Sequence, residues 1–193
     1  MKLARIAIFA SGSGTNAENN IEHFGKDGNI SVVLLLSNKK DAYVLERVKK
    51  FGTDSVVFSN NELQNSNLID NILSSKKVDY LILAGFLLKM PERIVDNYKG
   101  RIINIHPALL PKFGGKGMYG NNVHKAVIEA GEKRSGITIH LVDKDYDRGT
   151  ILFQAECDLS VNENCDSLAE KIHRLEQLYF PLIVEGYIKS RLQ

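Results

Sequence analysis

The chain has 193 residues, of which 44% are hydrophobic and 25% are charged, so it has the composition of a folded globular domain and not of a fibrous or disordered chain. Lys and Arg total 25 and Asp and Glu total 23, and a net charge of +2 argues against a nucleic-acid partner. Two cysteines, Cys157 and Cys165, exclude a disulfide framework and favour a reducing, cytoplasmic location, and every apolar run falls far below the ~20 residues of a membrane span.

Apolar runs alternate along the chain with more polar segments that suit helices. Nearly continuous apolar runs rich in β-branched residues are typical of strands buried on both faces. They occur at residues 4–10, 30–36, 55–58, 78–84 and 102–105. Helical patterns occur at residues 16–24, 42–51, 60–75, directly after Pro91, 123–130 and 167–188. Asn60 or Asn61 is expected to cap the third of these helices, and Gly52 to follow the end of the second.

The order of these segments predicts an α/β fold. Strands and helices alternate as in a doubly wound, Rossmann-like, mostly parallel sheet. The runs at residues 137–142 and 151–155 are separated by a turn-rich segment at 145–149, which predicts an antiparallel addition near the C-terminal end. No repeat, linker or low-complexity stretch divides the chain, so we expect a single domain over residues 1–193.

A glycine-rich loop follows the first expected strand and opens the first expected helix. Its residues are Gly12, Ser13, Gly14, Thr15 and Asn16. Backbone N–H groups at such a helix N-terminus form an anion site, for which a phosphate monoester is the simplest ligand. The loop also fits G-x-G-x-x-A, but the second strand ends without the acid that holds a nicotinamide dinucleotide's ribose. Lys39 and Lys40 at that point leave an NADP-binding reductase open as an alternative.

A second motif is formed by Asn104 and His106 at the end of the strand that begins at residue 102. Alternation places these two polar side chains on one face of the strand and Ile103 and Ile105 on the other. Pro107 should end the strand, so the pair lies at its carboxyl end, where open α/β sheets bind ligands. An amide and an imidazole there can stabilise an oxyanion on a tetrahedral intermediate.

Three aspartates, Asp143, Asp145 and Asp147, alternate in the turn-rich segment that ends at Gly149. Their spacing resembles that of a calcium loop, but the glycine and glutamate that complete such a loop are absent. The five histidines and two cysteines also lack metal-ligand spacing, so we expect no metal.

Together these motifs resemble a known family. The run from Asn104 to Pro111, followed by Asp147-x-Gly149, resembles the folate-dependent formyltransferases. The glycine-rich loop and the segment 37–42 make the chain most similar to the members that formylate phosphoribosylglycinamide in de novo purine synthesis. The resemblance runs from the first strand to about Pro181.

The resemblance implies roles for particular residues and for both halves of the chain. The N-terminal half would bind the nucleotide phosphate, and the C-terminal half would bind folate and carry out catalysis. The implied catalytic residues are Asn104, His106 and Asp147. The implied contacts of the phosphate and ribose are Gly12, Ser13, Gly14, Thr15, Asn16 and Glu176. The implied folate contacts are Leu87, Leu88, Lys89, Met90, Asn104, Val142 and Asp143.

The implied reaction moves the formyl group of 10-formyltetrahydrofolate to the glycinamide amine of 5-phosphoribosylglycinamide and releases tetrahydrofolate. The enzyme would work without a metal, on two small-molecule substrates, as a monomer or homodimer. We expect Asp147 to raise the pKa of His106, so that a protonated His106 and the Asn104 amide donate to the oxyanion. Another formyl-transferring or formyl-hydrolysing relative remains an alternative, although such relatives usually carry a further domain. A non-catalytic phosphate-binding module is also left open.

Overall fold

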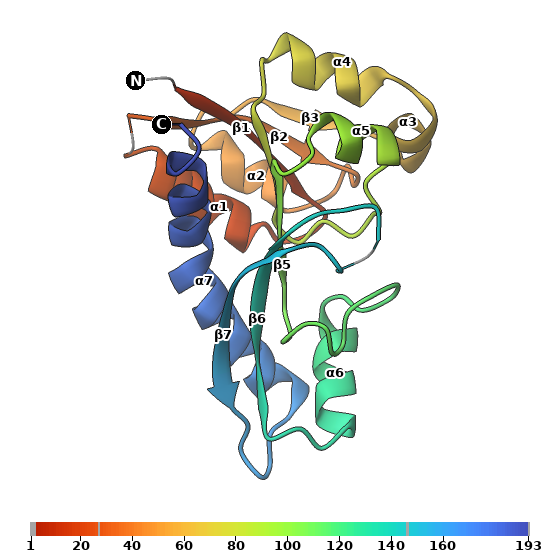
Figure 1. The fold of residues 1–193 in the computed structure, drawn as a ribbon, viewed down its shortest axis with the longest axis vertical. Helices are drawn as coiled ribbons and strands as arrows, with labels where there is room; N and C mark the ends of the chain where they lie inside the picture. Colours follow the sequence, from red (N-terminus) through yellow and green to blue (C-terminus); the bar gives the residue numbers. More distant parts are fainter. Residues whose placement is uncertain (1–2, 27, 146, 193) are drawn as a thin grey trace.

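A seven-stranded sheet runs through the computed structural model, which describes residues 3–26, 28–145 and 147–192 (Figure 1). Its strands are β1 (Ala4–Ala10), β2 (Ile30–Ser37), β3 (Ser55–Val57), β4 (Tyr80–Leu83), β5 (Ile102–His106), β6 (Arg134–Leu141) and β7 (Ile151–Asp158). They lie in the order β3-β2-β1-β4-β5-β6-β7. Strands β1 to β5 pair in parallel, whereas β6 pairs antiparallel with both β5 and β7. The predicted fold class is therefore confirmed, including the antiparallel addition.

Helices cover both faces of this sheet. They are α1 (Thr15–Phe24), α2 (Val44–Lys49), α3 (Asn60–Asn65), α4 (Leu68–Ser75), α5 (Glu92–Asn97), α6 (Asn121–Glu129) and α7 (Cys165–Lys189). One apolar core joins the sheet to α1, α2, α6 and α7, and a second joins the other face to α3, α4 and α5 (Figure 1). In the described residues, no helix is both long and apolar enough to cross a membrane.

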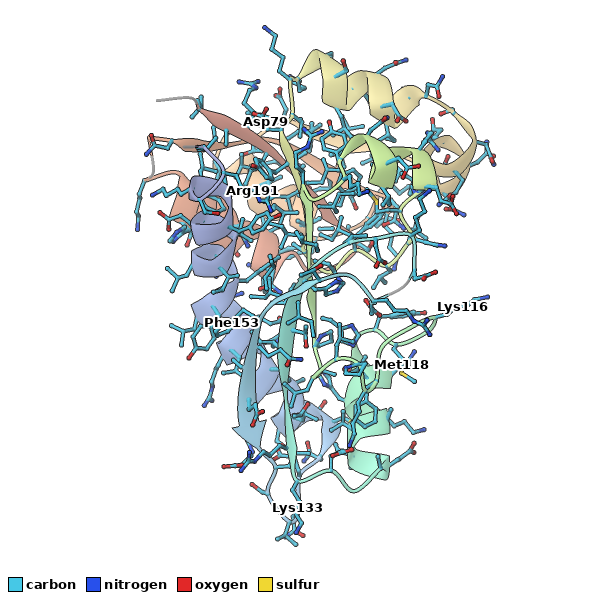
Figure 2. All side chains as sticks on the ribbon, viewed as in Figure 1. Asp79, Lys116, Met118, Lys133, Phe153 and Arg191 are labelled. Atoms are coloured by element: carbon cyan, nitrogen blue, oxygen red, sulfur yellow. The ribbon has the colours of Figure 1, made fainter. Side chains whose placement is uncertain are left out.

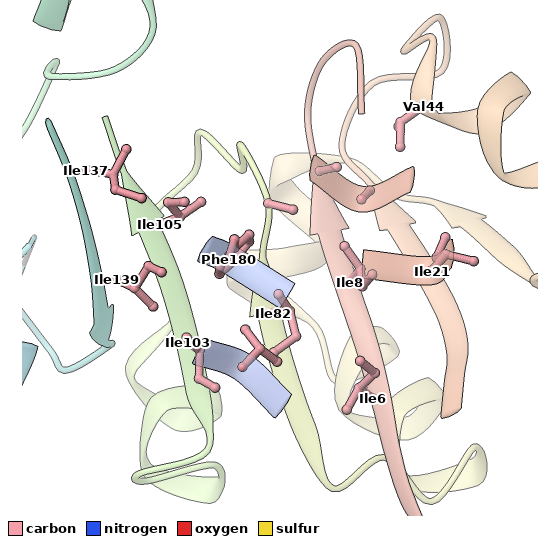
Figure 3. Packing of buried hydrophobic residues seen from close by; sticks show 14 of the residues in the cluster. Ile6, Ile8, Ile21, Val44, Ile82, Ile103, Ile105, Ile137, Ile139 and Phe180 are labelled. Atoms are coloured by element: carbon pink, nitrogen blue, oxygen red, sulfur yellow. The ribbon is translucent and has the colours of Figure 1, made fainter. Parts of the chain in front are cut away.

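The two cores explain how β5 presents its side chains. Ile103 and Ile105 belong to the core on the α7 side, beside residues of β6 and Phe180 (Figure 3). Ile102 belongs to the core on the opposite face. Because side chains alternate along a strand, Asn104 and His106 point away from Ile103 and Ile105, as the sequence predicts.

One predicted helix, residues 60–75, is wrong as a continuous element. It is divided into α3 and α4, and Ser66 between them has an extended backbone with φ −133° and ψ 165°. The expected asparagine cap is also wrong, because Ser59 is the N-cap residue and forms a capping box with Glu62. The break is held from outside the segment, because Arg93 of α5 donates hydrogen bonds to the carbonyls of Leu63, Gln64 and Ser66 and also to the Asp70 carboxylate.

We expect Arg93→Ala to lower the free energy of unfolding by about 2 kcal/mol, because three carbonyls and one carboxylate lose a charged donor. Urea denaturation followed by circular dichroism measures this change. Arg174→Ala is the control, since the Arg174 side chain is 80% exposed and pairs with Glu170 at a long distance of 3.9 Å. Equal midpoints for the two variants would show that Arg93 does not hold the α3–α4 break.

Two smaller features concern a peptide bond whose isomer the sequence left undecided and a helix that starts earlier than predicted. The Leu110–Pro111 peptide bond is cis. Helix α7 begins at Cys165, two positions before the predicted start, because the Asn164 side chain accepts from the backbone N–H groups of Asp166 and Ser167. The turn predicted at residues 145–149 includes Tyr146, which lies outside the described residues.

Candidate active site

The carboxyl ends of the central parallel strands open into one pocket of about 560 Å³. The glycine-rich loop after β1, the segment after β4, the end of β5, the turn after β6 and one face of α7 all line it. Every residue predicted for the site is part of this lining. The members are Gly12, Ser13, Gly14, Thr15, Asn16, Leu87, Leu88, Lys89, Met90, Asn104, His106, Val142, Asp143, Asp147 and Glu176. The structure therefore brings the whole predicted set together.

The Asn104 side chain is oriented by a residue on the neighbouring strand. Asn104 of β5 lies opposite His140 of β6 in the antiparallel register, and its Nδ2 is 3.0 Å from Nε2 of His140. Nδ1 of His140 is 2.9 Å from the carbonyl oxygen of Leu141, to which it can only donate. When the His140 ring is uncharged, its Nε2 is then the acceptor for the Asn104 amide. One N–H of that amide is thereby fixed, and the other can donate to a ligand.

The imidazole of His106 is 3% exposed and has two neighbours. Its Nε2 is 2.8 Å from the carbonyl oxygen of Phe113, and its Nδ1 is 3.7 Å from Oδ2 of Asp147. Burial is the largest influence and lowers the pKa of His106 below 6.5, although Asp147 and the Phe113 carbonyl act to raise it. The expected influence of Asp147, which is to raise the pKa of His106, is confirmed, but the net pKa is lowered because removing the imidazole from water outweighs an ion pair at this distance, so the expected protonated His106 is not supported.

Asp147 faces two histidines, and its side chain is 12% exposed. Its Oδ2 accepts a 2.8 Å hydrogen bond from the backbone N–H of Gly115, and its Oδ1 is 3.6 Å from Nε2 of His140. Burial acts to raise the pKa of Asp147, but His140 and His106, when their rings are protonated, and the Gly115 N–H together outweigh it and lower that pKa. A carboxylate therefore persists here at neutral pH, although it is largely screened from water.

The glycine-rich loop presents the N-terminus of α1 to the same pocket. Gly14 is the N-cap residue with φ 80°, and a Cβ atom there would lie 2.3 Å from Val44, so a side chain is excluded both by conformation and by space. The Asn16 side chain donates a 2.8 Å hydrogen bond to the buried carboxyl group of Glu176 on α7. Burial raises the pKa of Glu176, and the Asn16 hydrogen bond only partly offsets this rise.

The segment after β4 forms the more apolar side of the pocket. Met90 is 4% exposed and Leu87 is 36% exposed, and both line the pocket together with Val142. This side is tied to the glycine-rich loop, because the Ser11 hydroxyl accepts a 3.0 Å hydrogen bond from the Leu87 N–H. The pocket therefore has an apolar wall and an anion-binding wall, which suit the apolar and the phosphorylated parts of its ligands.

Several pocket residues were missed by reasoning from the sequence. His140 orients Asn104, and its signal was the antiparallel pairing of the two strands, which places it opposite Asn104. Phe113 and Gly115 act through backbone atoms, which no side-chain pattern reveals. His124, His173, Lys116 and Met118 also line the pocket, the last two from the loop before α6 (Figure 2). Among the described residues, no group of three or more His, Cys, Asp or Glu side chains could hold a metal ion.

These features define an α/β site with an amide, an imidazole and a carboxylate beside a helix N-terminus, which suits chemistry at a carbonyl carbon next to an anionic group. A family model described as formyl transferase matches residues 4–184. The chain therefore belongs to the formyl transferase family, whose members use a folate-derived formyl donor. This membership supports formyl transfer over the reductase that the glycine-rich loop left open.

Individual relatives agree with the family match. The chain is 40% identical over 197 residues to an Arabidopsis thaliana chloroplastic phosphoribosylglycinamide formyltransferase, covering 98% of this chain and 67% of the plant protein. It is 32% identical to a Haemophilus influenzae phosphoribosylglycinamide formyltransferase, covering 99% and 90% of the two chains. The crystal structure of phosphoribosylglycinamide formyltransferase from Bacillus halodurans superposes with a TM-score of 0.84 at 34% identity, covering 94% of each chain.

Proposed function

We propose that this protein transfers the formyl group of 10-formyltetrahydrofolate to the amine of 5-phosphoribosylglycinamide, a step of purine synthesis. The observation that carries the proposal is the single pocket that joins an anion-binding helix N-terminus to the group formed by Asn104, His106 and Asp147. The family match and the names of the relatives support formyl transfer to this acceptor.

The two substrates would occupy opposite walls of the pocket. The ribose phosphate would lie at residues 12–16, where backbone N–H groups and the α1 dipole favour an anion, and Glu176 would contact the ribose. The folate would lie along residues 87–90, Val142 and Asp143, which supply the apolar wall. Holding both substrates in one pocket places the amine beside the formyl carbon and so lowers the entropic barrier.

Asn104, His106 and Asp147 would act at the point where these walls meet. When the amine bonds to the formyl carbon, the free N–H of Asn104 donates to the developing oxyanion. His106, uncharged because burial lowers its pKa, accepts the proton that the amine loses. The Asp147 carboxylate, facing Nδ1, stabilises the resulting imidazolium. The proton then returns to folate N10 as its bond to the formyl carbon breaks.

The remaining parts of the proposal concern the protein as a whole. We infer that residues 1–193 form one domain, that the reaction uses no metal, and that the protein acts as a monomer or homodimer without a nucleic-acid partner. The free, half-buried Cys157 and Cys165 support a reducing cytoplasmic location.

The direct test is a steady-state assay with 10-formyltetrahydrofolate and phosphoribosylglycinamide that measures tetrahydrofolate by absorbance and the N-formyl product by mass spectrometry. Parallel reactions replace the acceptor with initiator methionyl-tRNA or with water alone. We expect product only with the ribonucleotide. Formylation of the tRNA, or release of formate without an acceptor, would instead assign the chain to another branch of the family.

The lowered pKa of His106 predicts the pH dependence of this assay. If the uncharged imidazole is the proton acceptor, kcat/KM is low in acid, rises as pH increases through the lowered pKa, and reaches its plateau at a lower pH than an ordinary histidine would give. His106→Asn should remove this rise and leave a low, nearly flat profile. A wild-type rate that is highest in acid and falls through neutral pH would show that the protonated form is the active one.

A further inference from the structure

His106 lies in a row of three residues that crosses the last three strands of the sheet. In the antiparallel registers, His106 of β5 lies opposite Thr138 of β6, and Thr138 lies opposite Gln154 of β7, the edge strand (Figure 1). Residues that lie opposite each other in a sheet present their side chains on the same face. Thr138 is fully buried, whereas Gln154 is exposed and is not among the described residues that line the pocket. The row therefore connects a side chain of the site to the outer edge of the sheet.

The hydroxyl of Thr138 and the amide of Gln154 hold the segment that follows His106. Oγ1 of Thr138 donates to the Ala108 carbonyl at 2.7 Å and accepts from the Leu110 N–H at 3.0 Å. Nε2 of Gln154 donates to that hydroxyl at 2.9 Å and to the Leu110 carbonyl at 3.0 Å. The two N–H bonds of the Gln154 amide thus have two acceptors, and both backbone groups of Leu110 are bonded. The segment is therefore fixed at Leu110 by side chains of two strands.

The Leu110 side chain carries this constraint to the next part of the chain. Leu110 is 6% exposed and lies against Gly114. A Cβ atom added at Gly114 would be 2.6 Å from Cδ2 of Leu110 and 3.2 Å from Cβ of Asp147. Such distances leave no room for a side chain, so the backbone at residue 114 packs closely against both. A shift of Leu110 would therefore move this backbone.

The peptide groups on either side of Gly114 contact the side chains of the site. Before it, the Phe113 carbonyl oxygen is 2.8 Å from Nε2 of His106. After it, the Gly115 N–H donates to Oδ2 of Asp147 at 2.8 Å. Because both contacts come from one short segment, a displacement of that segment changes the positions of the imidazole and the carboxylate together.

We propose that Gln154 is a positioning residue for the reaction. Its two hydrogen bonds hold Leu110 and, through it, the backbone of residues 113–115. That backbone in turn holds His106 and Asp147 in the arrangement that proton transfer requires. The inference rests on the proposed function, because it assigns a reaction to these two side chains. A misplacement of about 1 Å in a catalytic site can lower the rate about a hundredfold, so the loss of such a support affects kcat more than KM.

Gln154→Met tests this role, because methionine has a similar length and no N–H to donate. We expect kcat to fall about tenfold and KM for either substrate to change by less than about twofold in the steady-state formyl-transfer assay. Glu156→Met is the matched control, since Glu156 lies two positions along the same strand and pairs with the exposed Arg134 at 3.2 Å. It should leave kcat unchanged.

Gln154→Lys separates hydrogen bonding from packing. Lysine has the longer side chain, and its ammonium has several donors, so it can serve the same two acceptors from an exposed position. We expect kcat to return to within about threefold of wild type. If methionine is instead tolerated better than lysine, the contribution of Gln154 is apolar packing and the proposal fails.

Nuclear magnetic resonance of the His106 ring gives a readout that needs no catalysis, and His106→Asn assigns its signal. The Phe113 carbonyl and Asp147 both act to raise the pKa of His106, so displacement of the segment that contacts them should lower that pKa further. Gln154→Met should show this decrease, and Glu156→Met should not.

A Gln154→Met protein with the wild-type titration of His106 would overturn the proposal, even if its kcat is lowered, because the effect would then not pass through the imidazole. Failure of the proposed function has a different signature. In that case the wild-type protein forms no formyl product, but Gln154→Met still shifts the His106 titration.

Discussion

Asp147→Asn is expected to lower kcat about a thousandfold, while the fold and the affinity for ribose 5-phosphate remain nearly unchanged. The substitution keeps the size of the side chain, and the amide oxygen can still accept the Gly115 N–H, so the loop contact at 2.8 Å is preserved. What is lost is the negative charge that faces Nδ1 of His106 at 3.7 Å. The imidazolium formed during proton transfer would then be buried without a counter-ion, which is costly in a site so screened from water.

Single-turnover kinetics with both substrates measure this loss, and circular dichroism checks the fold. Asp158→Asn is the control, because it also removes one carboxylate but from a side chain that is 88% exposed at the end of β7. A rate for Asp147→Asn within about tenfold of wild type would show that the carboxylate is not part of the proton path.

The strands could be predicted more reliably than the helix boundaries, for a physical reason. A strand buried on both faces leaves a continuous apolar run, as residues 4–10 do, and its partners hardly alter that pattern. The division between α3 and α4 depends instead on Arg93, which follows Ser66 by 27 positions and supplies donors to the carbonyls at the break. The local sequence pattern of residues 60–75 therefore cannot indicate this contact with Arg93.

In the site, too, local signals in the sequence predict some features, whereas features that depend on distant parts of the chain cannot be predicted. Asn104 and His106 could be placed at the end of a strand because alternation and Pro107 are local signals. The role of His140 required the pairing of β5 with β6, and the pKa direction of His106 required its burial, neither of which a motif specifies. The residues to which the resemblance assigns roles all lie in one pocket. Kinetic measurements on variants of these residues are needed to test the roles.

The turn that carries Asp147 is packed closely against the end of β6. Gly149 lies against the end of β6, where a Cβ atom would be 1.7 Å from the carbonyl oxygen of Leu141 and 2.7 Å from its carbon. The Leu141 N–H also donates to the carbonyl of Thr150 at 2.9 Å, so the two backbones are held together at this point. We expect Gly149→Ala to lower the free energy of unfolding by about 3 kcal/mol, because one of two hydrogen-bonded backbones must move.

The same movement should reach the active site, since Asp147 precedes Gly149 by two residues and has φ 53°, a conformation that the turn must impose. Gly149→Ala protein that remains folded should therefore also lose most of its kcat, which a purely local packing defect would spare. Gly186→Ala is the matched control, because Gly186 is exposed within α7 with open space around a Cβ atom, and alanine there should stabilise the protein by about 0.5–1 kcal/mol. If Gly149→Ala unfolds at the wild-type urea concentration, the close approach of the turn to β6 does not hold Asp147 in place.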